Sequence, residues 1–197
     1  MASVLAVAAY FVLFGLLHSI LADPGPKMLA RRIFGVAADR WYRIAYIILA
    51  LIMVTPFFYI LAFLPDKVLY AVRAPWKWLM MAGQVLAAFG VLIALAQTNI
   101  DYFFGLAQLR GQRGSGGLVT NGFYCHLRNP LFLFGIVFLW LFPYMTLNLL
   151  TFNILATVYF YIGAIHEETS LFEEFGEQYR RYRQKVPMFI PRLRCES

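Results

Sequence analysis

Polar side chains that can bind a charged ligand gather in two short segments, residues 118–130 and residues 165–168. The candidates among them are an arginine, an asparagine, a tyrosine, two histidines and two glutamates: Arg128, Asn129, Tyr124, His126, His166, Glu167 and Glu168. A guanidinium can bind a carboxylate through two parallel hydrogen bonds, and a carboxylate can offset a positive charge. An imidazole titrates near neutral pH. These residue types therefore suit the binding of a charged cofactor, with proton transfer available beside it.

A purely structural interpretation of the same residues stands beside the functional one. Arg128 and Glu167 can form an interfacial ion pair that positions two helix ends, worth about 0–1 kcal/mol if it is exposed. The spacing alone favours neither interpretation. His18, the remaining histidine, follows a long apolar stretch. A lone histidine in such a place is more often held by structural hydrogen bonds than used in catalysis.

Long uncharged stretches must position these residues. The chain of 197 residues is 61% hydrophobic and 14% charged, against about half and about a quarter in soluble domains. Stretches without Asp, Glu, Lys or Arg cover residues 1–22, 44–65, 78–100 and 129–165. Each of the first three reaches roughly 33 Å as a helix, enough to cross a bilayer core of about 30 Å. This composition disfavours a soluble domain, a disordered chain and a nucleic-acid-binding protein.

The fourth uncharged stretch is too long for one span, because as a single helix it would reach roughly 55 Å. Turn-forming residues, Phe142-Pro143-Tyr144, stand near its middle. The stretch therefore predicts two short helices in a tight hairpin, which returns the chain to the same membrane face. Residues 118–130 and 165–168 would then meet.

The predicted fold is an all-α polytopic membrane protein with about five transmembrane helices, the last two forming the tight hairpin. We expect a single integral membrane domain, 1–197, with a three-helix front half at 1–100. The remainder, 101–197, would hold a cofactor-binding loop, the hairpin and the tail. Because the first basic residue is Lys27, the opening stretch lacks the basic region of a secretory signal and is expected to remain as a membrane helix.

Basic residues predict the orientation in the membrane. Five Lys or Arg lie in 23–43, three in 101–128 and six in the tail from 180 onward, against three in 66–77. The positive-inside rule then places the N-terminus outside and the C-terminus in the cytoplasm.

Three further expectations concern smaller features. Residues 167–185 predict an amphipathic helix, because Phe172, Phe175, Tyr179 and Tyr182 fall on one face, and an interfacial anchor is favoured over a lid. The glycine-rich run 111–117 predicts a flexible connector. Gln84 and Gln97 should form hydrogen bonds across helices.

The two cysteines, Cys125 and Cys195, show neither a disulfide framework nor metal-ligand spacing. We therefore expect no disulfide and no metal site.

An ordered set of motifs resembles the isoprenylcysteine carboxyl methyltransferase superfamily of membrane methyltransferases. These motifs are Leu118-Val119-Thr120-x-Gly122-x-Tyr124-x-x-x-Arg128-x-Pro130, Glu167-Glu168-x-x-Leu171, Phe175-Gly176-x-x-Tyr179-x-x-Tyr182 and Val186-Pro187-x-x-Ile190-Pro191. The front half is similar to the bacterial branch that contains methanethiol S-methyltransferase and the NnrU-like proteins. There the shared pieces are Phe14-Gly15-x-x-His18-Ser19-x-x-Ala22 and Phe104-Gly105-Leu106-x-Gln108.

The resemblance implies methyl transfer from S-adenosylmethionine to a thiol or carboxylate of an apolar or lipid-like acceptor, in a bacterial inner membrane. By position, the cofactor would be lined by Gly117, Leu118, Val119, Tyr124, Arg128, Asn129, Pro130, Phe132, Glu167 and Glu168. Glu167 would accept hydrogen bonds from the ribose and offset the sulfonium charge. Arg128 would bind the cofactor's carboxylate, and His18 or His166 would favour an acceptor thiolate. The expected partners are that acceptor and membrane lipids, with no nucleic acid.

Three positions depart from the family pattern. Asn129 and Phe132 stand where the family usually has histidine and tyrosine, and His166 stands where it usually has arginine. Asn129 can still donate and accept hydrogen bonds. Two alternatives stay open: an NADPH-dependent enzyme like the sterol reductases, which share a similar C-terminal pattern, and a non-catalytic NnrU-like protein that holds haem through His18.

Overall fold

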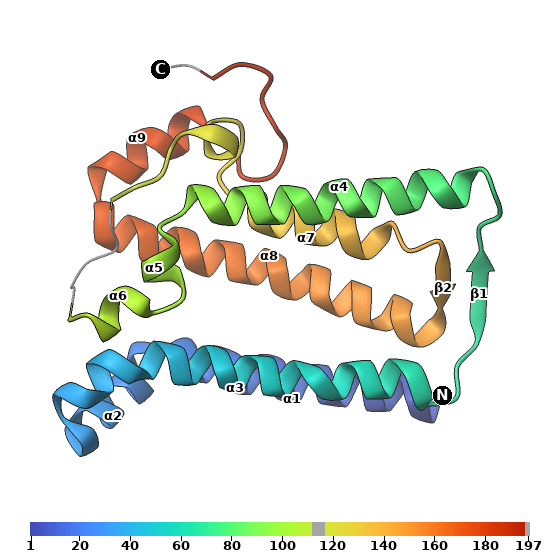
Figure 1. The fold of residues 1–197 in the computed structure, drawn as a ribbon, viewed down its shortest axis with the longest axis horizontal. Helices are drawn as coiled ribbons and strands as arrows, with labels where there is room; N and C mark the ends of the chain where they lie inside the picture. Colours follow the sequence, from blue (N-terminus) through green and yellow to red (C-terminus); the bar gives the residue numbers. More distant parts are fainter. Residues whose placement is uncertain (112–116, 196–197) are drawn as a thin grey trace. The chain divides into compact units, whose positions relative to one another are not determined.

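The structure, a computed structural model, describes residues 1–111 and 117–195 and is built almost entirely of helices (Figure 1). The long helices are α1 (Ala2–Ala22), α3 (Val36–Phe63), α4 (Trp76–Gln97) and α8 (Leu147–Phe175). The shorter ones are α2 (Pro24–Phe34), α5 (Ile100–Phe103), α6 (Leu106–Leu109), η1 (Gly122–Cys125), α7 (Pro130–Trp140) and α9 (Glu177–Lys185). The predicted all-α class is confirmed. The expected connector at 111–117 falls mostly on residues 112–116, outside the described residues.

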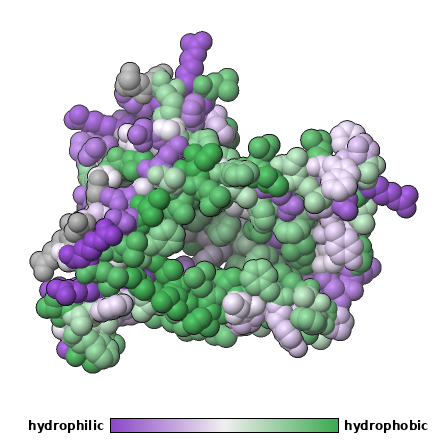
Figure 2. Space-filling view, viewed as in Figure 1, coloured by the Kyte–Doolittle hydropathy of each residue, from purple (hydrophilic) through white to green (hydrophobic). Residues whose placement is uncertain are grey.

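The four long helices confirm a polytopic membrane protein. Each is long and apolar enough to cross a bilayer, and α7 adds a shorter apolar helix. Only 6–17% of the residues in their most apolar windows are buried inside the molecule. Figure 2 accordingly shows hydrophobic side chains exposed over helix surfaces. Contact of this much apolar surface with water would be unfavourable, whereas the lipid of a bilayer would cover it.

The chain divides into two compact units, and the prediction of a single domain stays a prediction. The first unit contains residues 1–67, 100–115 and 146–155. In it, the hydroxyl of Tyr10 donates to the carbonyl of Met53 at 2.7 Å, which ties α1 to α3. Helix α3 begins eight residues before the predicted span, because a helix can continue into water while the uncharged stretch marks only the part in hydrocarbon.

The second unit contains residues 68–99, 116–145 and 156–197. Small residues let its helices approach closely: a Cβ on Gly90 of α4 would lie 2.7 Å from the ring of Phe134 on α7. The amide of Gln84 donates to the carbonyl of Phe138 at 3.3 Å, as predicted for a bond across helices. Gln97 of α4 also forms the predicted bond across helices, because its side-chain oxygen accepts from the backbone N–H of Phe123 in η1 at 2.8 Å.

The predicted hairpin turn is present and carries a feature that the sequence did not predict. After α7, β2 (Tyr144–Thr146) pairs with β1 (Val68–Ala71) in a two-stranded sheet. The backbone N–H of Val72 extends this pairing by donating to the carbonyl of Pro143 at 2.8 Å. The sheet satisfies backbone groups at the turn, where helical hydrogen bonds end.

The second helix of the hairpin continues far beyond its predicted end. Helix α8 has 29 residues and is about 44 Å long, so it exceeds a bilayer core of about 30 Å. No residue between Ile165 and Phe175 disfavours a helix. The break comes at Gly176, whose φ is +51°. The predicted amphipathic helix 167–185 is therefore divided, its first part belonging to α8 and its second forming α9.

Candidate active site

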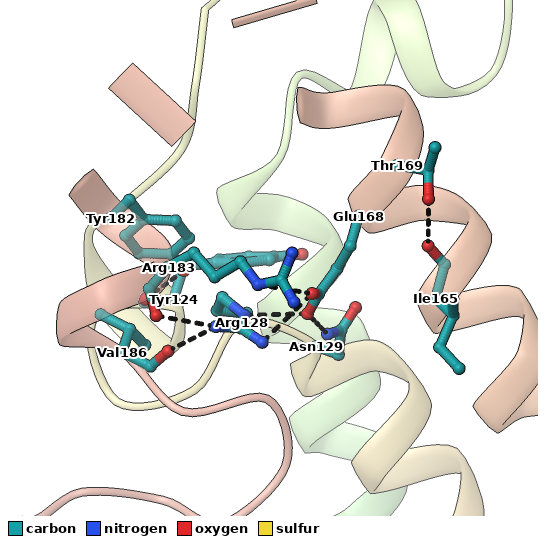
Figure 3. Close-up of polar contacts among 9 residues, drawn as sticks. All are labelled: Tyr124, Arg128, Asn129, Ile165, Glu168, Thr169, Tyr182, Arg183 and Val186. Carbon is teal, nitrogen blue, oxygen red and sulfur yellow. Dashed lines mark hydrogen bonds and ion pairs between the residues drawn. The ribbon is translucent and has the colours of Figure 1, made fainter. Parts of the chain in front are cut away.

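The two ends of the hairpin meet within the second unit, as predicted. Pro130 is buried at the first position of α7, where its missing N–H costs little. Two residues earlier, Arg128 faces Glu168 of α8 (Figure 3). Its Nε donates to Oε1 at 2.8 Å and its Nη2 to Oε2 at 3.1 Å. The entry and the exit of the hairpin are thus joined by a two-point ion pair.

The carboxylate of Glu168 is the centre of this network. The buried amide of Asn129 donates to Oε1 at 3.0 Å, and Nε of Arg183 lies 3.8 Å from Oε2. Only 10% of the Arg128 side chain and 8% of the Glu168 side chain are exposed. A pair this buried is stable only when further hydrogen bonds satisfy its remaining polar atoms, as they do here.

Arg128 is mostly occupied by the protein itself. Besides the carboxylate, its Nη1 donates to the carbonyls of Arg183 at 2.9 Å and Val186 at 3.0 Å. Four of its five N–H groups therefore have protein acceptors. The ion-pair interpretation of Arg128 holds, with Glu168 and not Glu167 as the partner. Its binding of a cofactor carboxylate stays a prediction.

The C-terminal tail is held against the hairpin entry by backbone hydrogen bonds. The N–H of Arg128 donates to the carbonyl of Pro187 at 2.9 Å, and that of Asn129 to the carbonyl of Met188 at 3.2 Å. The hydroxyl of Tyr182 donates to the carbonyl of Tyr124 at 2.6 Å. The tail therefore packs against the hairpin entry beside the ion pair.

Three tyrosines near this network are neutral hydrogen-bonding groups. Burial raises the pKa of Tyr124 well above its usual range, and the negative charge of Glu167 raises it further. Burial likewise raises the pKa of Tyr182. Burial and the charge of Glu168 raise the pKa of Tyr179 to about 12. The buried hydroxyl of Tyr179 has no hydrogen-bond partner among the residues that the structure describes.

Glu167 differs from Glu168 in its surroundings, because it is exposed. Its effect on the pKa of Tyr124 places its carboxylate near that phenol. Leu118 and Val119 are half-buried, and Gly117 is exposed with a φ of +100°. These placements are compatible with the predicted cofactor lining, which stays a prediction.

The other predicted residues lie as follows. Phe132 packs its ring 5.8 Å from that of Phe160, between α7 and α8. His166 is exposed on α8. His18 belongs to the first unit, where the hydroxyl of Tyr46 lies 2.7 Å from its Nε2, as expected for a histidine held by structural hydrogen bonds.

A cavity of about 350 Å³ opens beside the network. It is lined by Phe172, Arg180, Arg183 and Gln184. The sequence did not single out Arg180 or Arg183 as ligand-binding residues, because basic residues in a tail beside a membrane are ordinary.

The prediction of no disulfide is wrong: Cys125 and Cys195 are bonded, with Cα atoms 5.4 Å apart. They are 70 residues apart in the sequence, and no spacing rule links them. The tail brings them together as it runs back along the hairpin entry. The motif Val186-Pro187-x-x-Ile190-Pro191, taken as an extended segment, was the available signal.

Gly122 provides a test of how tightly the hairpin entry is packed. Its φ is +60°, and a Cβ there would overlap the side-chain amide of Gln97. We expect Gly122→Ala to lower the free energy of unfolding by about 2–4 kcal/mol, from left-handed strain and overpacking. Gly176→Ala is the control, because it has a φ of +51° with open space around it, and should cost only about 1–2 kcal/mol. Thermal unfolding in detergent measures both, and equal losses would contradict the packing.

Comparisons with known proteins give the family. No family model and no solved structure matches the chain. The chain is 33% identical over 189 residues to methanethiol S-methyltransferase 2 of Bradyrhizobium diazoefficiens, an alignment covering 92% of this chain and 70% of that protein. It is 30% identical over 201 residues to methanethiol S-methyltransferase of Mycobacterium tuberculosis, covering 94% and 78%. A third relative, from Pseudomonas deceptionensis, is 36% identical over 110 residues, covering 52% and 42%. Given these identities and its apolar helices long enough to span a membrane, the chain belongs to the methanethiol S-methyltransferase family of membrane methyltransferases.

Proposed function

We propose that the protein transfers a methyl group from S-adenosylmethionine to a small apolar thiol, with methanethiol as the first candidate. One observation carries the proposal. The ion pair of Arg128 and Glu168 joins the two ends of the hairpin, which supports a single cofactor site formed by both ends. The names of the relatives support methyl transfer and the thiol acceptor.

The residues present fit the cofactor. The exposed carboxylate of Glu167 can accept hydrogen bonds from ribose hydroxyls and offset a sulfonium charge. The buried hydroxyl of Tyr179 lacks a partner in the described part of the chain and can bond a polar ligand atom. Arg180 and Arg183, which line the cavity, can bind the cofactor's carboxylate in place of the occupied Arg128. When bound, S-adenosylmethionine supplies an electrophilic methyl group on a positively charged sulfur.

The chain's own residues chiefly position the two reactants and shield them from water. Asn129 and Arg128 hold Glu168, which fixes this part of α8 and so the position of Glu167 one residue before it. Direct displacement by a thiolate gains mostly from proximity and alignment. An acceptor thiol must lose its proton, and the imidazole of His166, next to Glu167, is the candidate that takes it at a ring nitrogen. The products would be a thioether, through the new carbon–sulfur bond, and S-adenosylhomocysteine, through loss of the methyl–sulfonium bond.

We also propose that the site faces the cytoplasm of a bacterium. Fourteen Lys and Arg fall in the segments predicted for the side of the hairpin ends and tail, against three in the segment predicted for the other side. The positive-inside rule then places the N-terminus outside and the C-terminus inside. A cytoplasmic site has direct access to S-adenosylmethionine.

The experiment is a methyl-transfer assay on the purified full chain in detergent or liposomes. Isotope-labelled S-adenosylmethionine is supplied with methanethiol, with a farnesylcysteine analogue, or with no acceptor. We expect labelled dimethyl sulfide with methanethiol and inhibition by S-adenosylhomocysteine. If only the carboxylate of the farnesylcysteine analogue were methylated, the proposal of a thiol acceptor would be overturned. Oxidation of NADPH or a haem Soret band, without methyl transfer, would overturn the function.

A further inference from the structure

Three side chains with metal-binding atoms meet where the tail crosses the hairpin entry. They are Cys125, His126 and Cys195, and one ligand atom from each lies within 4.8 Å of the other two. Two come from the end of η1, and the third arrives 70 residues later. The proposed methyl transfer uses none of these three side chains.

The histidine has the ring orientation of a metal ligand. Its Nδ1 lies 2.7 Å from the backbone carbonyl of Arg192, an acceptor only, so the hydrogen sits on Nδ1. Nε2 therefore carries a lone pair, and it lies 3.4 Å from Sγ of Cys195. Metal-binding histidines commonly donate their second nitrogen to a carbonyl in this way, which fixes both the tautomer and the ring.

Arg192 holds the two segments in register. Its N–H donates to the carbonyl of His126 at 3.0 Å, and its Nε to the carbonyl of Cys125 at 2.9 Å. Its Nη1 donates to the carbonyl of Lys185 at 2.9 Å. The cluster thus rests on backbone hydrogen bonds, and a neighbouring positive charge favours the thiolate form of cysteine.

We propose that Cys125, His126 and Cys195 bind one Zn²⁺ when both cysteines are thiols. Two thiolates and an imidazole are a ligand set that suits zinc. Binding replaces the two S–H protons by metal–sulfur bonds and releases both protons. Thiolates on one zinc lie about 3.8 Å apart, a separation that the Cα distance of 5.4 Å accommodates. Cys195 is exposed, so water can complete a tetrahedral site.

The dithiol form is the one expected where the site is proposed to lie. The cytoplasm keeps cysteines reduced, whereas a disulfide offers no thiolate to a metal. In that compartment the metal would take over the link between tail and hairpin entry. The inference does not depend on which acceptor is methylated.

The test uses the full chain in detergent, reduced with a phosphine and freed of metal by chelation. After Zn²⁺ is added back and the excess is removed, we expect elemental analysis to find one equivalent of bound Zn²⁺. With Co²⁺ in its place, we expect a thiolate-to-metal charge-transfer band and the d–d bands of a tetrahedral site. Cys125→Ser, Cys195→Ser and His126→Ala should each weaken Zn²⁺ binding by about 100-fold or more in competition with a chromophoric chelator. His166→Ala, the matched control on α8, should leave the affinity unchanged.

A second measurement keeps the proposal testable should a variant fold poorly. In the unaltered chain, Zn²⁺ should protect both cysteines from alkylation and release two protons per metal. Absence of the cobalt–thiolate band in the reduced chain would overturn the proposal. So would full Zn²⁺ affinity in Cys195→Ser, or alkylation of both cysteines at an unchanged rate.

Discussion

Glu168→Gln is expected to lower the free energy of unfolding by about 3–5 kcal/mol, the usual loss when one partner of a buried ion pair is removed. The variant leaves the guanidinium of Arg128 buried without a countercharge. It also places an amide N–H₂ among donors that need an acceptor, including the side chain of Asn129. Methyl transfer should fall with folding stability, because the same pair holds the tail on the hairpin entry.

The experiment compares single and paired replacements by thermal or denaturant unfolding in detergent. Arg128→Met and Glu168→Leu should each destabilise strongly, and the double variant should recover part of the loss, because no charge is left buried. Glu173→Gln, an exposed glutamate on the same helix, is the control and should be nearly neutral. Strictly additive losses would show that the two side chains do not interact.

Glu167→Gln is expected to weaken S-adenosylmethionine binding by about 10–100-fold, since a hydrogen bond to a charged group contributes about 1.5–3 kcal/mol. Unlike Glu168, this carboxylate is exposed. The unfolding free energy should therefore change little. The two adjacent glutamates would then have different roles, with Glu167 in ligand binding and Glu168 in folding stability.

The choice of ligand tells what Glu167 recognises. S-adenosylmethionine carries a sulfonium charge and S-adenosylhomocysteine does not. If the carboxylate offsets that charge, Glu167→Gln should weaken the first more than the second in calorimetric titrations. Equal losses would assign it to the ribose hydroxyls, and unchanged affinity for both would remove it from the site.

The sequence predicts the ion pair but assigns it to the neighbouring glutamate. Adjacent residues point about 100° apart around a helix, so the partner depends on how α8 is rotated. That rotation is set by packing: Ala164 is fully buried, and Glu168 lies four residues later on the same face. Spacing of small and polar residues along α8 held this information, whereas the motif Glu167-Glu168 alone did not.

Other features depend on contacts that no local pattern encodes. The uncharged stretches predict the spans, because lipid selects on composition and length. They give no information on the strand pair β1–β2 or on the return of the tail to Arg128. Both rest on backbone hydrogen bonds between segments distant in sequence. The pairing of Cys125 with Cys195 follows from that return and could not be predicted without it.

The length of α8 has a consequence for where the reactants come from. Counted from Leu147, Glu168 lies about 32 Å along the helix axis, roughly the depth of one hydrocarbon core. With Leu147 at one face of that core, the carboxylates of Glu167 and Glu168 would lie near the other face, where hydrocarbon meets water. Under the proposed function, a polar methyl donor would then arrive from solution, while an apolar thiol would diffuse in from the lipid and the thioether would leave by the same route. Neither compound then has to cross a phase in which it dissolves poorly.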